Sequence, residues 1–160
     1  LEAQVRSKVS RAKADMRTIV TAIESYRVDA NKYPPTQFLQ EGRYAYLTSP
    51  ISYITSIPPD PFGTGTPGMW TYANGHLGFY TYDFMVKYCV TDLWGFPATW
   101  WTSVMVGAQV DGASSKQYYL ASAGPDKRVG VDGTANPGFA VPYDATNGTI
   151  SWGDIHRIGP

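Results

Sequence analysis

The residues of this sequence best suited to chemistry are four aspartates near its C-terminal end. They are Asp126, Asp132, Asp144 and Asp154. Carboxylate oxygens on glycine-rich loops are the hard donors that calcium prefers, and Asn147 and Ser151 could add neutral oxygens. The stretch from Asp144 to Gly148 is one residue short of the first ligand spacing of an EF-hand. The alternative is ordinary turn chemistry, because Asp-Gly, Asn-Gly and Pro-Asp pairs also build turns.

A second candidate site is a run of aromatic residues within positions 70–117. The run contains Trp70, Tyr72, Tyr80, Tyr82, Trp94, Phe96, Trp100 and Trp101. Such residues could form a platform for sugars or for the surface of a partner, or they could be the core of a sheet packed on a helix. Trp100 and Trp101 are adjacent, so on a strand they would point to opposite faces. They cannot both lie in the same core layer, so one of them is the residue to test for surface exposure, and Trp100 and Trp101 are together the candidate ligand surface.

No motif in the sequence supports catalysis. His76 and His156 lie in no motif with a nucleophile and at no metal-ligand spacing with a second histidine or a cysteine. Cys89 is the single cysteine, which excludes an intramolecular disulfide. Residues 63–68 lack the lysine and the helix start that a phosphate-binding loop needs. The net charge is zero, which argues against a nucleic acid held by bulk electrostatics.

The element that must position these residues is a long N-terminal helix. Residues 1–29 contain neither glycine nor proline, whereas the rest of the chain holds all 16 glycines and all 12 prolines. Apolar residues recur every three or four positions, which is typical of one stripe of an α-helix. The stripe consists of Leu1, Val5, Val9, Ala12, Met16, Ile19, Ile23 and Tyr26. We expect a sheet to cover the stripe from Val9 onward and to leave Leu1 and Val5 exposed.

The first half of this helix is rich in basic side chains. They are Arg6, Lys8, Arg11, Lys13 and Arg17, and only Glu2 and Asp15 oppose them. One interpretation is a solvated helix face. The other is an edge that pairs with acidic groups of a neighbouring subunit or of a membrane surface.

The remaining chain predicts a connecting region followed by strands. Asn31 to Pro35 ends the helix, because consecutive prolines cannot continue it. Residues 31–68 then contain a possible short helix around 38–47 and close on a rigid, proline-rich clamp, Ile57 to Gly63. In the predicted sheet region, residues 69–123, Asn74-Gly75 favours a hairpin between strands 70–73 and 77–82. Further strands are predicted within 78–92, 98–110 and 116–123, and residues 124–160 are predicted to be a loop region. The sequence thus predicts one α+β domain, a long N-terminal helix packed on an antiparallel sheet.

Several blocks of the sequence, taken in order, resemble the type IV pilins. The blocks are Leu1 to Gln4, Ala14 to Tyr26, Asn31 to Pro34, Ile57 to Gly63, Leu120 to Asp126 and Tyr143 to Ile155. They are most similar to the major pseudopilins of type II secretion systems. The resemblance implies a pilin-like fold over residues 1–160 and a structural filament subunit that is not an enzyme. Residues 70–117 are longer and more aromatic than the sheet of that family, which leaves open an adhesive head that binds polysaccharide or another surface ligand.

The resemblance also implies partners and a location. In this family a prepilin peptidase removes a short leader, and an apolar segment of about twenty residues then anchors the subunit in the inner membrane. We therefore expect Leu1 to begin the second half of such a helix, in a truncated, soluble head. The full-length protein would work with inner-membrane assembly machinery and self-associate into a helical filament, with its head periplasmic or extracellular. Filament contacts are expected at Leu1, Val5, Arg6, Arg11 and Arg17.

The calcium hypothesis gains part of its support from the same resemblance. Major pseudopilins bind calcium in the loop after their Gly-Pro-Asp, which by position brings over Asp126 and Asp132. Asp144 and Asp154 have no firm counterpart in the family and rest on their oxygen chemistry alone.

Overall fold

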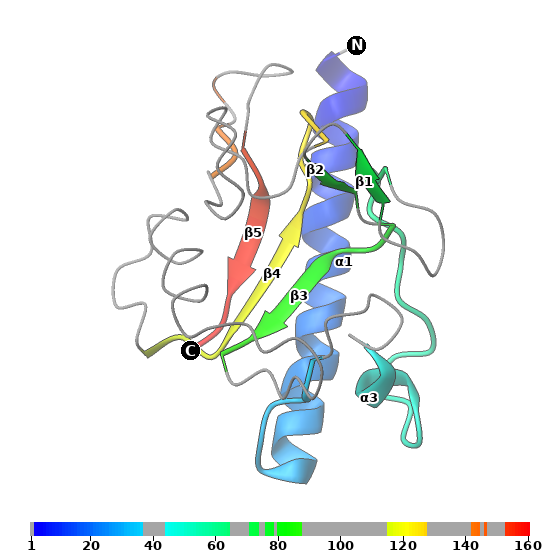
Figure 1. Ribbon diagram of the computed structural model, residues 1–160, viewed down its shortest axis with the longest axis vertical. Coiled ribbons are helices and arrows are strands. Elements are labelled where there is room, and N and C mark those ends of the chain that lie inside the picture. Colours follow the sequence, from blue (N-terminus) through cyan, green and yellow to red (C-terminus); the bar gives the residue numbers. More distant parts are fainter. Residues whose placement is uncertain are drawn as a thin grey trace.

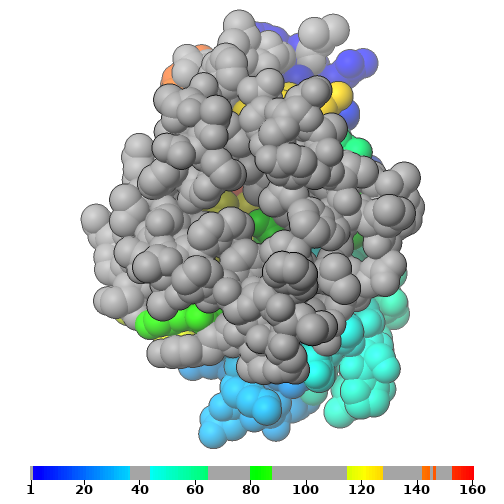
Figure 2. Space-filling model, in the orientation of Figure 1, coloured from blue at the N-terminus to red at the C-terminus, as the bar shows by residue number. Residues whose placement is uncertain are grey.

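The computed structural model describes residues 2–36, 44–64, 71–73, 76–78, 80–87, 115–127, 142–144, 146 and 153–160. Two helices and five strands lie in these ranges. The helices are α1 (Glu2–Ala30) and α3 (Ala45–Thr48), and the strands are β1 (Thr71–Ala73), β2 (His76–Gly78), β3 (Asp83–Val86), β4 (Tyr118–Ser122) and β5 (Ile155–Ile158). Figure 1 shows α1 running along the back of the sheet formed by β3, β4 and β5, with α3 beside its lower end. Figure 2 shows the C-terminal end of α1 and the segment around α3 next to each other at the bottom of the view.

The predicted N-terminal helix is confirmed as α1. Its apolar stripe lies against the sheet, and the buried positions are Val9, Ala12, Met16, Ile19, Ala22 and Ile23. The helix ends at Ala30 because Asn31 turns into the left-handed region, with φ of 52°, and two prolines follow. Val5, which was expected to be exposed, is half-buried and packs against the core. The covered part of the apolar stripe therefore extends one turn further toward the N-terminus than expected. Leu1 lies outside the described residues.

The larger sheet is antiparallel in the order β3-β4-β5, with β4 in the centre. In its register Phe84 pairs with Leu120, and Leu120 pairs with Arg157. Phe84, Val86, Tyr118, Leu120 and Ile155 join the stripe of α1 in one hydrophobic core. Tyr119 and Ala121 point to the opposite face and are also buried, so the central strand is buried on both faces.

The predicted hairpin is also confirmed. β1 and β2 pair antiparallel around residues 74–75, with Ala73 opposite His76. β3 and β4 lie within the predicted strands 78–92 and 116–123. α3 lies at the C-terminal end of the predicted short helix 38–47. The predicted strand 98–110 and Cys89 lie outside the described residues.

One strand was not predicted. β5 lies within residues 124–160, where the sequence predicted a loop region. Its four residues are too short to show a clear alternation of apolar and polar side chains. The strand forms because β4 offers its second edge: Tyr119 pairs with Ile158, and Ser122 pairs with Ile155. The sheet therefore extends into the C-terminal region by a long-range pairing that local patterns do not reveal.

Candidate functional site

A buried aspartate joins the proline-rich clamp to the end of β4. Asp60 is 7% exposed. Its Oδ1 accepts hydrogen bonds from the Phe62 backbone N–H, at 3.0 Å, and from the Ser122 hydroxyl, at 2.8 Å. Its Oδ2 accepts the backbone N–H of Ala123 at 2.9 Å. Burial raises the pKa of Asp60 despite these three donors, which act in the opposite direction. The sequence predicted the clamp, but not that a carboxylate fastens it.

A second polar link connects the sheet to the middle of α1. The Tyr82 hydroxyl donates to Asp15 Oδ2 at 2.9 Å, and Arg11 Nε lies 3.6 Å from the same oxygen. Tyr82 is fully buried, and burial together with its bond to Asp15 raises the pKa of its hydroxyl. The backbone N–H of Asp60 donates to the carbonyl of Tyr80 at 3.0 Å, so the clamp also adjoins the segment that leads into β3. These hydrogen bonds fix the positions of the helix, the clamp and the sheet relative to one another.

The three arginines predicted as filament contacts have different surroundings. Arg6 pairs with Glu2 at 3.7 Å, and both side chains are at least 70% exposed. Arg11 is directed to Asp15 and supports the fold. Arg17 is exposed and forms no ion pair with any described residue. Of these three arginines, Arg17 is therefore the one whose charge no described acidic side chain of the same chain offsets.

The candidate calcium ligands have different environments. Asp126 is half-buried in the turn after β4, Asp144 is exposed, and Asp154, directly before β5, is 2% exposed. The side chain and backbone N–H of Thr146 donate to Asp144 Oδ1 at 2.7 and 2.8 Å, which lowers the pKa of Asp144. This is the turn chemistry that the sequence offered as the alternative. Asp132, Asn147 and Ser151 lie outside the described residues.

The chain segments that carry Asp126, Asp144 and Asp154 nevertheless meet at Gly153. A Cβ on Gly124, which has φ of 67°, would collide with the Gly153 carbonyl, and a Cβ on Gly153 would collide with Pro142. The Tyr143 N–H donates to the Asp154 carbonyl at 2.9 Å. Among the described residues, no group of three or more acidic, histidine or cysteine side chains could hold a metal ion. The calcium site therefore stays a prediction that needs the residues outside the described ranges.

The other candidates are placed only in part. Trp100 and Trp101 lie outside the described residues, so the ligand surface stays a prediction. His156 stacks on Tyr119, with ring centroids 6.0 Å apart. Burial lowers the pKa of His156 and raises that of Tyr119. Among the described residues, His156 Nδ1 and the Tyr119 hydroxyl are buried and have no hydrogen-bond partner, and no pattern in the sequence predicted this.

The arrangement of α1 against an antiparallel sheet defines the class of protein. A long N-terminal helix whose single apolar stripe packs on β3, β4 and β5 is an α+β arrangement consistent with the pilin-like fold. No helix within the described ranges is both long and apolar enough to cross a membrane.

The comparison with protein families agrees with this architecture. Residues 1–74 match the family of type II secretion system (T2SS) protein G. The match spans α1, α3, the clamp and β1. The resemblance to the major pseudopilins is thereby confirmed over these residues. Searches of curated proteins and of solved structures returned no significant match.

Proposed function

We propose that this protein is a structural subunit of a type II secretion pseudopilus and that the described fold is its head domain. The observation that carries the proposal is the match of residues 1–74 to the protein G family. The packing of α1 supports it, because one stripe of the helix faces the sheet while the basic side chains of its first half face solvent. In this proposal the protein assembles and has no catalytic role.

The exposed face of α1 is the surface we assign to contacts between copies. Arg17 is exposed, and the partner of Arg6 among the described residues is the exposed Glu2, so both charges can be offered to a neighbour at little cost to the fold. Arg11 is a poorer candidate because it already supports Asp15. Charged contacts of this kind set the register and orientation of neighbouring subunits more than they set affinity.

The proposal extends to location and to the assembly partners of the family. The full-length precursor would be anchored in the inner membrane, processed by the prepilin peptidase and added to the filament by the assembly machinery. Its head would face the periplasm. Because the basic residues lie on the same helix as the buried stripe that packs on the sheet, we expect the contact surface and the head to move together.

The test is photo-cross-linking in cells that produce the full-length protein with its secretion genes. A photoreactive residue replaces Lys13, which is exposed one helical turn before Arg17. We expect a ladder of cross-linked multimers that Arg17→Glu weakens strongly. Arg157→Glu is the matched control, since Arg157 is an exposed arginine on β5 rather than on α1, and it should leave the ladder unchanged. Absence of a ladder from the otherwise unchanged protein contradicts the proposal.

A further inference from the structure

The C-terminal end of α1 carries a cluster of aromatic side chains at the surface. The ring of Tyr26 packs edge-to-face with two rings from the segment around α3, with centroids 6.4 Å from Tyr46 and 5.5 Å from Tyr53. Tyr46 is 39% exposed, and Ile51 in the same segment is 59% exposed. Two of the three large apolar side chains that are exposed among the described residues therefore lie in this one segment.

Asp29 gives this cluster a negative charge. The Tyr53 hydroxyl donates to Asp29 Oδ2 at 3.0 Å, and the carboxylate is exposed. Asp29 also lies in the last turn of α1, where the helix dipole contributes roughly half a negative charge and favours a cation over an acid. Tyrosine rings attract cations over their faces as well. This surface, which we call the acidic-aromatic end (Tyr26, Asp29, Tyr46 and Tyr53), is thus suited to receive a cation.

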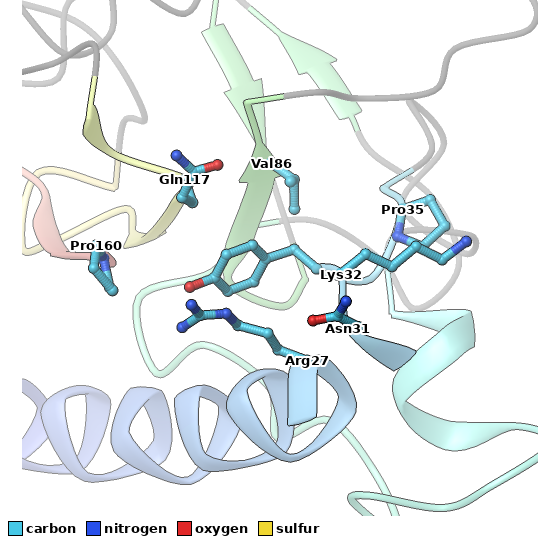
Figure 3. A pocket seen from close by; sticks show the side chains of 8 residues that line it. Arg27, Asn31, Lys32, Pro35, Val86, Gln117 and Pro160 are labelled. Carbon is cyan, nitrogen blue, oxygen red and sulfur yellow. The ribbon is translucent and has the colours of Figure 1, made fainter. Parts of the chain in front are cut away.

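The cations close to Asp29 in the sequence have other surroundings. Arg27 pairs with Glu24 at 3.3 Å, and its guanidinium lies 5.0 Å from the centre of the Tyr33 ring. Figure 3 shows Arg27 and Lys32 in the walls of a pocket of about 650 Å³ between the end of α1 and the sheet. Within the described part of the chain, no cation forms an ion pair with Asp29. The acidic-aromatic end therefore has no counter-charge among these residues.

Two cations without an acidic partner lie on another side of the same helix. An α-helix turns by about 100° per residue, so Tyr26 points roughly opposite to Arg17, and Asp29 lies roughly 120° from it. Lys13 lies one turn before Arg17 and shares its side of α1. Both are exposed, and neither forms an ion pair with any described residue; we call these two residues the basic flank. Arg11 lies on the side of Asp29, but about five turns away from it.

We propose that the acidic-aromatic end of one copy receives the basic flank of the next copy. The inference rests on the proposed function and names the surface that the basic residues of α1 contact. The guanidinium of Arg17 pairs with the carboxylate of Asp29 and lies over the exposed ring of Tyr46. Because the two surfaces face different sides of one helix, a pair of copies does not satisfy both at once. The contact then repeats from copy to copy, as an open filament requires.

The test is photo-cross-linking of the full-length protein in cells that contain its secretion genes, with a photoreactive phenylalanine derivative in place of Tyr46. This position is exposed, and the derivative keeps an aromatic ring there. We expect cross-linked dimers in which mass spectrometry identifies a link to residues 13–17 of the other copy. The same derivative in place of Arg157, which is exposed on β5, is the control and should not link to these residues.

An exchange of charges tests the pairing itself. Arg17→Glu and Asp29→Arg should each lower the yield of the Tyr46 cross-link about fivefold, which is the range of one exposed ion pair. The double variant carries the same two charges in exchanged positions and should recover most of the yield. Asp29→Arg should leave the fold intact, because Asp29 is exposed and a cation suits the C-terminal end of a helix.

The possible outcomes separate this inference from the proposed function. A double variant as weak as the single variants overturns the inference, and so do links from Tyr46 to another protein or to residues outside the first half of α1. A ladder from the photoreactive residue at Lys13 without any link from Tyr46 leaves the filament in place and refutes this contact. Absence of links from both positions refutes the proposed function and this inference together.

Discussion

Replacing Asp60 with alanine removes the acceptor of three buried hydrogen bonds at once. The donors are the backbone N–H groups of Phe62 and Ala123 and the hydroxyl of Ser122. A buried donor left without its partner costs about 1–3 kcal/mol, so the gross loss is roughly 3–9 kcal/mol. Removing a buried carboxylate also relieves its desolvation penalty, which is several kcal/mol and is the reason that its pKa is raised. We therefore expect Asp60→Ala to lower the free energy of unfolding by about 3 kcal/mol.

Urea unfolding followed by far-ultraviolet circular dichroism measures this loss. The expected signature is a lower midpoint at an unchanged slope, together with a melting temperature roughly 6–12 °C lower. Asp29→Ala is the matched control, because Asp29 also accepts a hydrogen bond from a side chain, that of Tyr53 at 3.0 Å, but is exposed. This control should cost less than about 1 kcal/mol.

A double-mutant cycle tests whether Asp60 acts through Ser122. Ser122→Ala alone should cost about 1 kcal/mol, because Asp60 keeps its two backbone donors. The double variant should lose about 1–2 kcal/mol less free energy of unfolding than the two single losses added together. The reason is that in Asp60→Ala the Ser122 hydroxyl is already a buried donor without an acceptor, and Ser122→Ala removes it. A loss below about 1 kcal/mol for Asp60→Ala, or strict additivity in the cycle, would refute the reasoning.

Two further predictions concern pH and metal. The pKa of His156 is lowered by burial, so the unfolded chain takes up a proton more readily than the folded one, and stability should fall as pH drops below about 6.5. His156→Phe keeps a ring against Tyr119 and removes the titrating group. In urea unfolding measured from pH 7 to pH 5, this variant should lose less stability than the unchanged protein. Parallel plots of unfolding free energy against pH for the two proteins would remove His156 as the cause. Millimolar calcium should raise the melting temperature of the unchanged protein, and Asp132→Ala should abolish the rise. A melting temperature that ignores calcium would remove the predicted site.

The sequence predicted the parts of the fold that rest on local patterns. The stripe of α1, its stop before Pro34 and the β1–β2 hairpin follow from spacing of three and four, from proline geometry and from Asn74-Gly75. The pairing of β5 with β4 was not predictable, because it joins residues more than thirty positions apart and depends on an available sheet edge. The same holds for the candidate sites. In the sequence, Asp60 is one aspartate in a turn-rich segment. Its role follows from hydrogen bonds to Ser122 and Ala123, which lie more than sixty positions away and are brought to it by the fold.

Charge patterns in the sequence identify exposed cations, but only the packing shows which of them already have partners. Among the described residues, Arg11 lies 3.6 Å from Asp15, whereas Arg17 forms no ion pair.

The most direct test of the proposed function is the fate of extracellular proteins after the gene is deleted. We predict that proteins normally released by the type II system accumulate in the periplasm and that the intact gene restores their release. The Arg17→Glu form should restore release poorly, and the Arg157→Glu form should restore it fully. Unchanged release from the deletion strain would contradict the assignment of this protein to the secretion pseudopilus.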